Sequence, residues 1–371
     1  MSSSQEIIYS DTAGVSRIQP SVISAINNYY CTHATEGKVG IKNSTQNTIP
    51  SLKNEISTLI NCSSEEIAIT KNTTEGINII AQGYPWQPGD RILIPDNEYP
   101  ANVYPWLFLK NKGVIIDYIP TKNGVIALED INQLIHSNTK ILALSHVGYL
   151  SGYTAPLNKL GELCKQNDIH FFVDAAQSAG VLPIDVKKSN ITALSTCGWK
   201  WIMAPVGVGF LYCSKALLKN ITPVYVGADA LDEVNIYSPK YPFTFFQDSR
   251  KFEYSSSTLS VAIGLNKALE IINTISVKKI EKQTTAHIKY LDEALKNIGF
   301  NSYLKHKEEP ITRSGILSVK HKKITSEELH QKLLSHNIHT ALWHGYIRFS
   351  PSYLNSKEES SEIVHCLTKY L

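Results

Sequence analysis

Two ionisable residues, Asp174 and Lys200, stand in sequence contexts that could support chemistry. Asp174 ends the apolar run IHFFVD, which is typical of a buried strand. A carboxylate at the end of a buried strand is costly unless it meets a cation or several hydrogen-bond donors. Taken alone, Asp174 is equally compatible with an acid that caps the N-terminus of the following helix.

Lys200 lies in the segment TCGWKWIMAPVGVGFLY, between two tryptophans and ahead of a turn rich in proline and glycine. A lysine in this setting can lay its stem along aromatic surface and leave its amine in water. Partial burial of the amine would instead lower its pKa, as a lysine needs in order to attack a carbonyl and form a Schiff base. The two residues together therefore predict more than either does alone.

Strand and helix patterns alternate around these residues. Short apolar runs typical of strands occur at 67–69, 91–95, 114–119, 140–145, 170–173 and 206–213. Helical patterns separate them at 74–83, 101–110, 128–136 and 156–167. Strands this apolar, separated by helices, predict an α/β fold with a mainly parallel sheet covered on both faces. Ligands of such sheets bind beyond the carboxyl ends of the strands, where Asp174 is expected.

The pattern changes after about residue 260. Two helical stretches, 259–273 and 277–297, precede short strands at 315–320 and 346–350, and the T-x-x-E and S-x-x-E spacings at 325–328 and 356–359 predict helix starts. These elements indicate a smaller α+β domain. We predict a large domain over residues 16–258 and a small C-terminal domain over 259–371 that also takes in the N-terminal segment 1–15.

Composition argues against several classes of function. The net charge of +3 predicts no broad footprint for nucleic acid, and no apolar run is long enough to cross a membrane. The start, MSSSQEIIYS, lacks the basic and apolar parts of a signal peptide. The six cysteines show no C-x-x-C spacing, which argues against a zinc site or a disulfide framework. We expect a cytoplasmic protein with free thiols.

Three segments, VDAAQ, GWKW and PVGVGFLY, have the order and spacing that resemble the class V aminotransferase superfamily of fold-type I pyridoxal-phosphate (PLP) enzymes. That superfamily includes cysteine desulfurases, selenocysteine lyases, kynureninases and isopenicillin N epimerase-like proteins. The resemblance extends from YSDTAG near the start to RFSPSYLN near the end. It implies a large domain with a mainly parallel, seven-stranded type of sheet, a smaller C-terminal α+β domain, and PLP as the cofactor.

The resemblance also implies roles around the cofactor ring. Lys200 would hold PLP as a Schiff base and, once freed by the substrate, take the proton from Cα. Asp174 would keep the pyridine nitrogen protonated, and Gln177 would hydrogen-bond the phenolic oxygen. Tyr99, in NEYPANVYPW, takes the place of a histidine that many members stack on the ring. A tyrosine can still stack there, but it is a poor proton shuttle at neutral pH.

Around the phosphate, TKNTTEGINIIAQG is similar to the family's phosphate loop. The resemblance implies that Thr74 gives its hydroxyl and that the backbone N–H groups of Glu75 and Gly76 face the phosphate at a helix N-terminus. Cys197 aligns with a residue that often hydrogen-bonds the phosphate, and Trp199 replaces a histidine that usually precedes the lysine. Both are expected to contact the cofactor.

Two further elements are implied by the resemblance. FEYSSSTLS looks like the segment that reaches into the partner subunit's site, with Ser256 in place of a phosphate-binding threonine, so we expect a homodimer with shared active sites. RFSPSYLN is similar to the family's element in which an arginine, here Arg348, clamps the α-carboxylate of a small amino-acid substrate through two parallel N–H bonds.

The chain also departs from the cysteine desulfurases. Those enzymes carry a nucleophilic cysteine on a loop shortly before this arginine, whereas residues 335–348, SHNIHTALWHGYIR, contain none. The nearest cysteine, Cys366, lies beyond the arginine. Tyr149 stands where many desulfurases have an asparagine. Without a thiolate in reach, no enzyme persulfide can form by that route.

These departures favour a PLP-dependent C–S lyase that eliminates a β-substituent from a sulfur-containing amino acid. Reprotonation at Cα or at the cofactor would instead make the protein an epimerase-like enzyme or a class V aminotransferase. A PLP-fold protein without catalysis, serving as a binding module, is a third alternative. Retention of Asp174, Gln177, Lys200 and Arg348 together argues against that third one.

Overall fold

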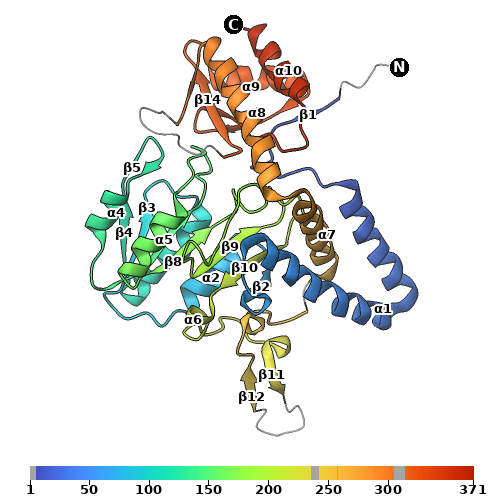
Figure 1. Cartoon of the computed structure of the whole chain (residues 1–371), viewed down its shortest axis with the longest axis vertical. Helices are drawn as coiled ribbons and strands as arrows, with labels where there is room; N and C mark the ends of the chain where they lie inside the picture. Colours follow the sequence, from blue (N-terminus) through green and yellow to red (C-terminus); the bar gives the residue numbers. More distant parts are fainter. Residues whose placement is uncertain (1–5, 235–241, 257, 305–313) are drawn as a thin grey trace.

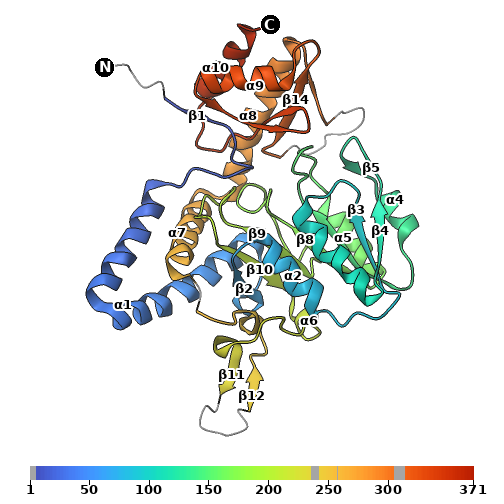
Figure 2. The same cartoon turned by 180° about the vertical axis from the view of Figure 1, so that it is seen from behind.

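The core of the protein is a seven-stranded sheet. The computed structural model describes residues 6–234, 242–256, 258–304 and 314–371 (Figure 1, and from behind in Figure 2). In spatial order the strands are β2 (Ile67–Thr70), β10 (Gly209–Cys213), β9 (Ala193–Cys197), β8 (His170–Asp174), β7 (Thr139–Ser145), β3 (Arg91–Pro95) and β4 (Ile115–Ile119). Strand β10 is antiparallel to both of its neighbours, and the other pairs are parallel. The predicted α/β fold with a mainly parallel sheet is confirmed.

Alternate residues of each central strand pack on opposite faces of the sheet, because successive side chains of a strand point to opposite sides. On β3, Leu93 joins one buried cluster while Ile92 and Ile94 join another. Helices α1 (Pro20–Ile60), α4 (Leu128–Leu134), α5 (Leu157–Gln166) and α7 (Leu259–Ile275) contribute to the first cluster. Helices α2 (Thr73–Gly83), α3 (Tyr104–Leu107) and α6 (Lys215–Leu218) contribute to the second. Burial on both faces explains why these strands are almost wholly apolar.

A second, four-stranded sheet forms the C-terminal part of the molecule, at the top of Figure 1. Its order is β13 (Phe300–Ser302), β14 (Leu317–His321), β17 (Tyr346–Phe349) and β16 (Ala341–Trp343), all antiparallel. Helices α8 (Val277–Asn297), α9 (Ser326–Ser335) and α10 (Lys357–Thr368) pack with it around a third cluster. The N-terminal strand β1 (Ile8–Tyr9) pairs with β15 (Ile338–His339) beside this sheet.

Helices α7 and α8 lie between the cores of the two sheets along the chain. Helix α7 packs along α1, and its buried face belongs to the first cluster rather than to the C-terminal one. Helix α8 then runs from one core to the other, with Ile280 in the first cluster and Ile288 in the third. The predicted division after residue 258 stays a prediction, and the packing places α7 with the core of the large sheet.

Several elements differ from the sequence expectation. The 41-residue helix α1 was not predicted, and it bends at Gly37, whose φ of 54° lies in the left-handed region that glycine tolerates best. The predicted helix over 101–110 is broken into η2 (Pro100–Asn102), α3 and η3 (Phe108–Lys112), because Pro105 has no N–H and restricts the residue before it. Strand β9, which carries polar residues within ALSTC, was also missed.

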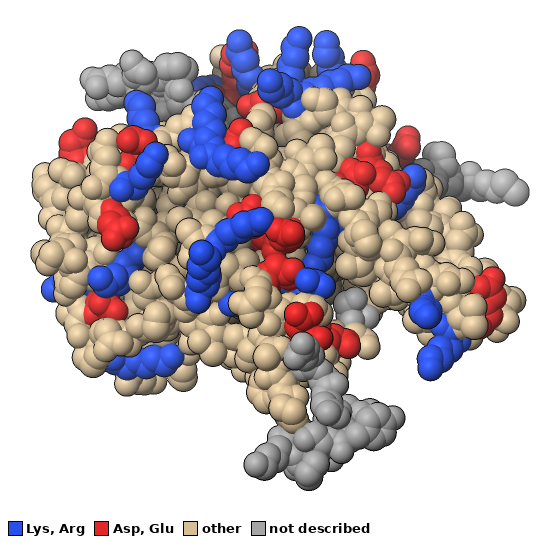
Figure 3. Space-filling view, turned by 60° about the horizontal axis from the view of Figure 1, so that its bottom comes forward, with Lys and Arg blue, Asp and Glu red and all other residues tan. Residues whose placement is uncertain are grey.

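The remaining short elements join or flank these layers. They are η1 (Ser64–Glu66), β5 (Thr121–Lys122), β6 (Val125–Ile126), η4 (Ala228–Ala230), β11 (Leu231–Val234), β12 (Phe243–Phe245) and η5 (Ser249–Phe252). The predicted helix starts are confirmed, since Thr325 accepts a hydrogen bond from the Glu328 amide and Ser356 forms a full capping box with Glu359. Among the described helices, none is both long and apolar enough to cross a membrane. On the face shown in Figure 3, positive and negative side chains intermingle on a largely uncharged surface.

Candidate active site

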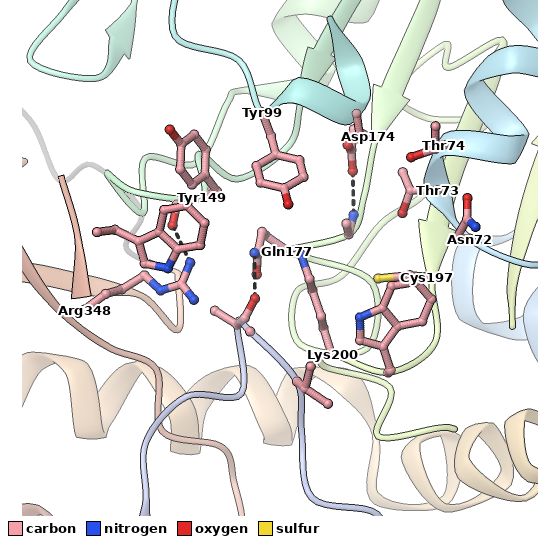
Figure 4. A pocket seen from close by; sticks show the side chains of 17 residues that line it. Asn72, Thr73, Thr74, Tyr99, Tyr149, Asp174, Gln177, Cys197, Lys200 and Arg348 are labelled. Atoms are coloured by element: carbon pink, nitrogen blue, oxygen red, sulfur yellow. Dashed lines mark hydrogen bonds between the residues drawn. The ribbon is translucent and has the colours of Figure 1, made fainter. Parts of the chain in front are cut away.

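A cavity of about 460 Å³ opens beyond the carboxyl ends of β8 and β9. This is the position at which open α/β sheets bind their ligands. It brings together residues from the N-terminal segment, the start of α2, the strand ends and the C-terminal sheet (Figure 4). The lining residues are Ala13, Gly14, Val15, Asn72, Thr73, Thr74, Tyr99, Ala101, Tyr149, Asp174, Ala176, Gln177, Cys197, Trp199, Lys200, Trp343 and Arg348.

Asp174 and Lys200 line this cavity as a pair of opposite charges. The Asp174 side chain is buried at the end of β8, and its Oδ1 accepts a hydrogen bond from the Ala176 amide at 2.8 Å. Burial raises the pKa of Asp174, while the Ala176 N–H and the positive charge of Lys200 act in the opposite direction. Lys200 lies in the loop between β9 and β10, which is braced by the Gly198 amide on the Val208 carbonyl. The positive charge of Lys200 thus favours the ionised form of the buried Asp174 carboxylate.

Tyr99 forms one wall beside this lysine. The Lys200 Nζ lies 5.5 Å from the centre of the Tyr99 ring, which places the ring within reach of a flat group attached at the lysine. The preceding residue, Glu98, fixes the loop by accepting bonds from the Ser145 amide at 2.6 Å and the Ser145 hydroxyl at 2.7 Å. Part of Glu98 is exposed, but its carboxylate is enclosed, and burial raises its pKa to about 7.

The N-terminus of α2 faces the cavity through Thr73 and Thr74. Asn72 caps the helix, its Oδ1 accepting from the Glu75 amide at 2.8 Å, and its carbonyl accepts from the Gly76 amide at 3.4 Å. The predicted contact of the Glu75 and Gly76 amides with a phosphate stays a prediction, and in this structure both amides are bonded within the helix. The first two amides, those of Thr73 and Thr74, have no partner within a helix.

Gly76 has a different role, which the structure explains by close packing. A Cβ added at this residue would lie 2.2 Å from the Ser195 Oγ on β9. The Ser195 hydroxyl in turn donates to the Thr73 carbonyl at 2.9 Å. Glycine at position 76 therefore lets α2 approach the sheet closely enough for its N-terminus to reach the cavity.

Gln177 is held at both ends of its amide. Its Oε1 accepts from the Trp201 Nε1 at 2.9 Å, and its Nε2 donates to the Ala13 carbonyl at 3.0 Å. The second N–H of Nε2 remains for a ligand. Cys197 and Trp199, both singled out from the sequence, also line the cavity. The site residues carried by the two strand ends are thus brought together as expected.

Arg348 lies at the other end of the cavity. It is only 2% exposed, its Nη1 donates to the Tyr149 carbonyl at 3.0 Å, and its Nη2 donates to the Asp11 Oδ1 at 3.0 Å. Its Nε is buried and, among the described residues, has no partner. Burial lowers the pKa of Arg348, and the Asp11 carboxylate opposes this effect. A buried guanidinium with free donors is suited to receiving a carboxylate.

Ser256 does not lie in this cavity. It lines a second one of about 770 Å³, together with Lys71, Glu75 and Tyr254. Within one chain the structure therefore does not bring Ser256 or the side chain of Glu75 to Lys200. The role of Ser256 in a neighbouring subunit stays a prediction, and an ordinary loop is the alternative.

Several residues of the cavity were missed by sequence reasoning. Asn72 and Thr73 flank the predicted Thr74, and the N-cap preference of asparagine before T-T-E could have indicated them. Trp343 lies in SHNIHTALWHGYIR, and no local pattern there indicates that its side chain lines a cavity. Asp11 lies in YSDTAG, but no pattern in the sequence indicates that this acid meets an arginine 337 residues away.

Comparison with known proteins identifies the family. The family model for class V aminotransferases matches residues 8–347. The chain belongs to the class V aminotransferase family. Among curated relatives, a probable cysteine desulfurase of Pyrococcus abyssi is 31% identical over 298 residues, which cover 78% of this chain and 73% of that protein.

Solved structures agree with this assignment. The apo cysteine desulfurase of Thermococcus onnurineus NA1 matches with a TM-score of 0.89 and 25% identity, over 98% of this chain and 94% of that one. The cystine C–S lyase C-DES, solved with its reaction product cysteine persulfide, matches with a TM-score of 0.88 over 98% of this chain and 97% of that one. At 23% identity, this second match shows likeness of fold alone.

The protein is thus a PLP-dependent enzyme of the class V family, and the cavity fits that cofactor. Lys200 offers a primary amine, and Asp174 a buried carboxylate with one oxygen directed by the Ala176 amide. The start of α2 offers backbone N–H groups and the Thr74 hydroxyl, the donor set that a phosphate requires. Tyr99 offers a ring face. An amine, an acid, an anion site and an aromatic face in one cavity match the four chemical parts of PLP.

Proposed function

We propose that this class V enzyme is a β-eliminating C–S lyase that lacks the desulfurase cysteine. The observation that carries the proposal is the turn between β16 and β17. Only His344 and Gly345 join Trp343 to Tyr346, so a two-residue turn stands where the desulfurases carry a cysteine loop. Both turn residues have positive φ, 49° and 73°, as a tight hairpin requires.

None of the six cysteines is suited to receive sulfur from a substrate in this cavity. Cys197 is the one cysteine among the described lining residues, and it lies buried at the end of β9 with a pKa raised by burial. Burial also raises the pKa of Cys62 and of Cys164 to about 12. A thiol held in its neutral form is a poor nucleophile, so sulfur would leave as a small molecule.

We assign the residue roles as follows. PLP, when bound, accepts electrons from the Cα of the attached amino acid. Lys200 would hold it as a Schiff base and later take the Cα proton, while Asp174 accepts the pyridine N–H. The amides of Thr73 and Thr74, with the Thr74 hydroxyl, would hold the phosphate.

At the other end of the cavity, Arg348 would bind the α-carboxylate through its free N–H groups. With the carboxylate fixed there and the amino group attached near Lys200, the Cα–H bond has one strong base beside it. The Cβ–S bond then breaks, the sulfur leaves with the electron pair and takes a proton, and water converts the remaining fragment to pyruvate and ammonia. Tyr99 could stack on the ring but offers no efficient proton donor to the leaving group.

Incubation of the purified holoenzyme with cysteine and with cystine tests this function. We expect pyruvate and ammonia in equal amounts, and no label from ³⁵S-cysteine on the protein. Alanine as product, with label trapped on a cysteine, would restore the desulfurase assignment. A keto acid from another amino acid, or exchange of the α-proton without elimination, would establish the aminotransferase or epimerase alternative.

We further propose a homodimer with composite sites. Large apolar side chains stand exposed on the chain, among them Tyr104 at 67%, Phe108 at 60% and Val226 at 59%. Tyr104 and Phe108 line one open surface cavity together with Tyr99, and a contiguous exposed apolar patch typically marks a protein interface. Ser256 is exposed and lies away from the Lys200 cavity of its own chain, which is compatible with a contact to a neighbour's phosphate site. Sedimentation at assay concentration would show a dimer, and an active monomer would disprove the shared site.

A further inference from the structure

Three aromatic side chains form a continuous wall along the cavity. The Tyr99 and Tyr149 ring centres are 5.3 Å apart with an interplanar angle of 67°, and those of Tyr149 and Trp343 are 5.9 Å apart with an angle of 79°. Both contacts are edge-to-face, the arrangement that aromatic pairs favour. We call Tyr99, Tyr149 and Trp343 the aromatic wall.

The aromatic wall spans the distance between the two groups that would fix a substrate. Lys200 Nζ lies 5.5 Å from the Tyr99 ring at one end, and the guanidinium carbon of Arg348 lies 5.7 Å from the Trp343 ring at the other. An amino acid held by its carboxylate at Arg348 and its nitrogen near Lys200 must place Cα between them. Its side chain therefore leaves Cα next to the wall.

Among its described lining residues, the cavity offers no charged group to pair with the substrate side chain. Its described lining contains three ionised residues, Asp174, Lys200 and Arg348, and each has a role toward the cofactor or the α-carboxylate. A charged substrate side chain would meet no ionic partner among the described lining residues and would lose part of its hydration against the rings, of which Tyr99 and Trp343 are each 37% exposed. An apolar or aromatic group meets rings instead.

The wall is held in place by the hairpin of β16 and β17. Trp343 pairs with Tyr346 directly across the two-residue turn, which leaves the backbone little freedom. The Tyr149 hydroxyl lies 3.3 Å from the His344 Nε2, so the turn is also tied to the loop after β7. The backbone that carries the indole is therefore fixed by the hairpin.

From this geometry we propose that the substrate is a cysteine whose sulfur carries an uncharged apolar or aromatic substituent. This inference rests on the proposed β-elimination and names the substrate class of the same site. Thioether sulfur packs favourably against aromatic rings, and the substituent beyond it would extend along Trp343. Elimination breaks the Cβ–S bond, releases the substituted thiol, and yields pyruvate and ammonia after addition of water.

The test compares kcat/KM of the holoenzyme for S-phenyl-L-cysteine, S-methyl-L-cysteine and the charged S-carboxymethyl-L-cysteine. We expect the phenyl substrate to exceed the carboxymethyl one by at least about tenfold. In Trp343→Ala, the value for the phenyl substrate should fall about tenfold, and that for the methyl substrate by less than about threefold. Tyr346→Ala is the matched control. It removes an aromatic ring from the same hairpin, but that ring packs on Tyr303 and does not line the cavity.

Two outcomes would overturn the proposal. Equal kcat/KM for the phenyl and carboxymethyl substrates would show that the wall does not select. An equal loss for all three substrates in Trp343→Ala would show that Trp343 acts only by orienting Arg348.

A binding measurement separates this inference from the proposed function. L-phenylalanine and L-aspartate carry no sulfur leaving group, and their competition with a reactive substrate measures selection alone. Pyruvate from unsubstituted cysteine only, with no preference for L-phenylalanine, would retain the lyase and reject the aromatic selection. Preference for L-phenylalanine that is lost in Trp343→Ala, without elimination from any sulfur substrate, would retain the selection and reject the lyase.

Discussion

The two ends of the cavity are built in different ways. The cofactor end, with Thr74, Asp174 and Lys200, comes from the start of one helix and the ends of neighbouring strands of a single sheet. The substrate end, with Tyr149 and Arg348, comes from a loop of that sheet, a strand of the second sheet and the N-terminal segment that supplies Asp11. The first end is set by the layered core, and the second by contacts between separate parts of the chain.

The positions of the residues at the cofactor end follow from the fold, whereas the residues at the substrate end can differ between enzymes that share this fold. Residues at the strand ends inherit their positions from a sheet buried on both faces, so any class V enzyme with this core can hold the cofactor there. Residues at the substrate end depend on one hairpin turn and one ion pair. Differences in reaction and substrate are therefore expected at the Arg348 end.

The largest expected effect is at the cofactor end. Lys200→Ala removes the only amine in the described lining of the cavity, so activity should fall below detection while the circular dichroism spectrum stays unchanged. Borohydride treatment should then fix no cofactor to the protein. A reducible adduct at another lysine would mean that the two ends have been assigned to the wrong cavity.

Asp174→Asn keeps the shape of the buried side chain and removes its charge. We expect turnover to fall by about 10²–10³-fold, the loss typical of a preorganised electrostatic group, with cofactor content largely retained. Stopped-flow absorbance and cofactor content measure the two effects separately. Near-normal turnover would show that Asp174 only caps the segment after β8.

Glu98 lies beside the cofactor end and should make stability depend on pH. Burial raises its pKa to about 7, above its ordinary value, so the folded state binds the proton more tightly than the unfolded state does. The contribution of Glu98 to the free energy of unfolding is therefore fully present below about pH 4.5 and is lost as the pH rises towards 7.

Glu98→Gln should therefore stabilise cofactor-free protein at pH 8 relative to pH 5 by on the order of 2 kcal/mol, discounted for the partial exposure of the residue. Urea unfolding at the two pH values measures this difference, with the same substitution at exposed Glu162 as the control. An identical pH dependence in Glu98→Gln and the parent would show that the carboxylate is not enclosed in solution.

At the substrate end, Arg348→Lys keeps the charge and loses the planar set of donors. We expect KM to rise about tenfold while cofactor content stays the same, because a lysine cannot pair with a carboxylate through two parallel bonds. Steady-state kinetics with cofactor quantification checks this split. Equal losses of cofactor and of substrate affinity would place Arg348 in the fold and not in the substrate site.

The smallest expected effect is that of the cysteines. Each of the six, changed singly to serine, should leave pyruvate formation within about twofold, because no thiolate takes part in the reaction. Cys197 is the exception to be examined, since it lines the cofactor end. A large loss of pyruvate formation on substitution of any other cysteine would support transfer of sulfur to the protein.

Sequence alone predicted the cofactor end better than the substrate end, for a physical reason. Asp174 and Lys200 stand in local patterns, an apolar strand ending in an acid and a lysine between tryptophans, which survive without knowledge of the fold. The contact between Asp11 and Arg348 has no local signature, because only the pairing of β1 with β15 and of Asp11 with Ser350 brings it about.

The start of α2 is a second place where the sequence could not predict the details of the site. Thr74 was taken from the resemblance of TKNTTEGINIIAQG to the family's phosphate loop, which could not tell which amides the Asn72 cap would occupy. The start of α7 was predicted correctly, but amphipathic periodicity could not show that its buried face packs with the core of the large sheet. Residues in local sequence patterns could be predicted, whereas contacts between segments far apart in the sequence could not.

The ion pair between Asp11 and Arg348 also has a consequence for the synthesis of the protein on the ribosome. Residues 72 to 200, which complete the cofactor end, leave the ribosome while much of the chain is still to be made. The carboxylate anchor joins residues 337 positions apart, so it cannot form until translation is nearly finished. The substrate end can therefore form only after nearly the whole chain has been made, later than the residues of the cofactor end leave the ribosome.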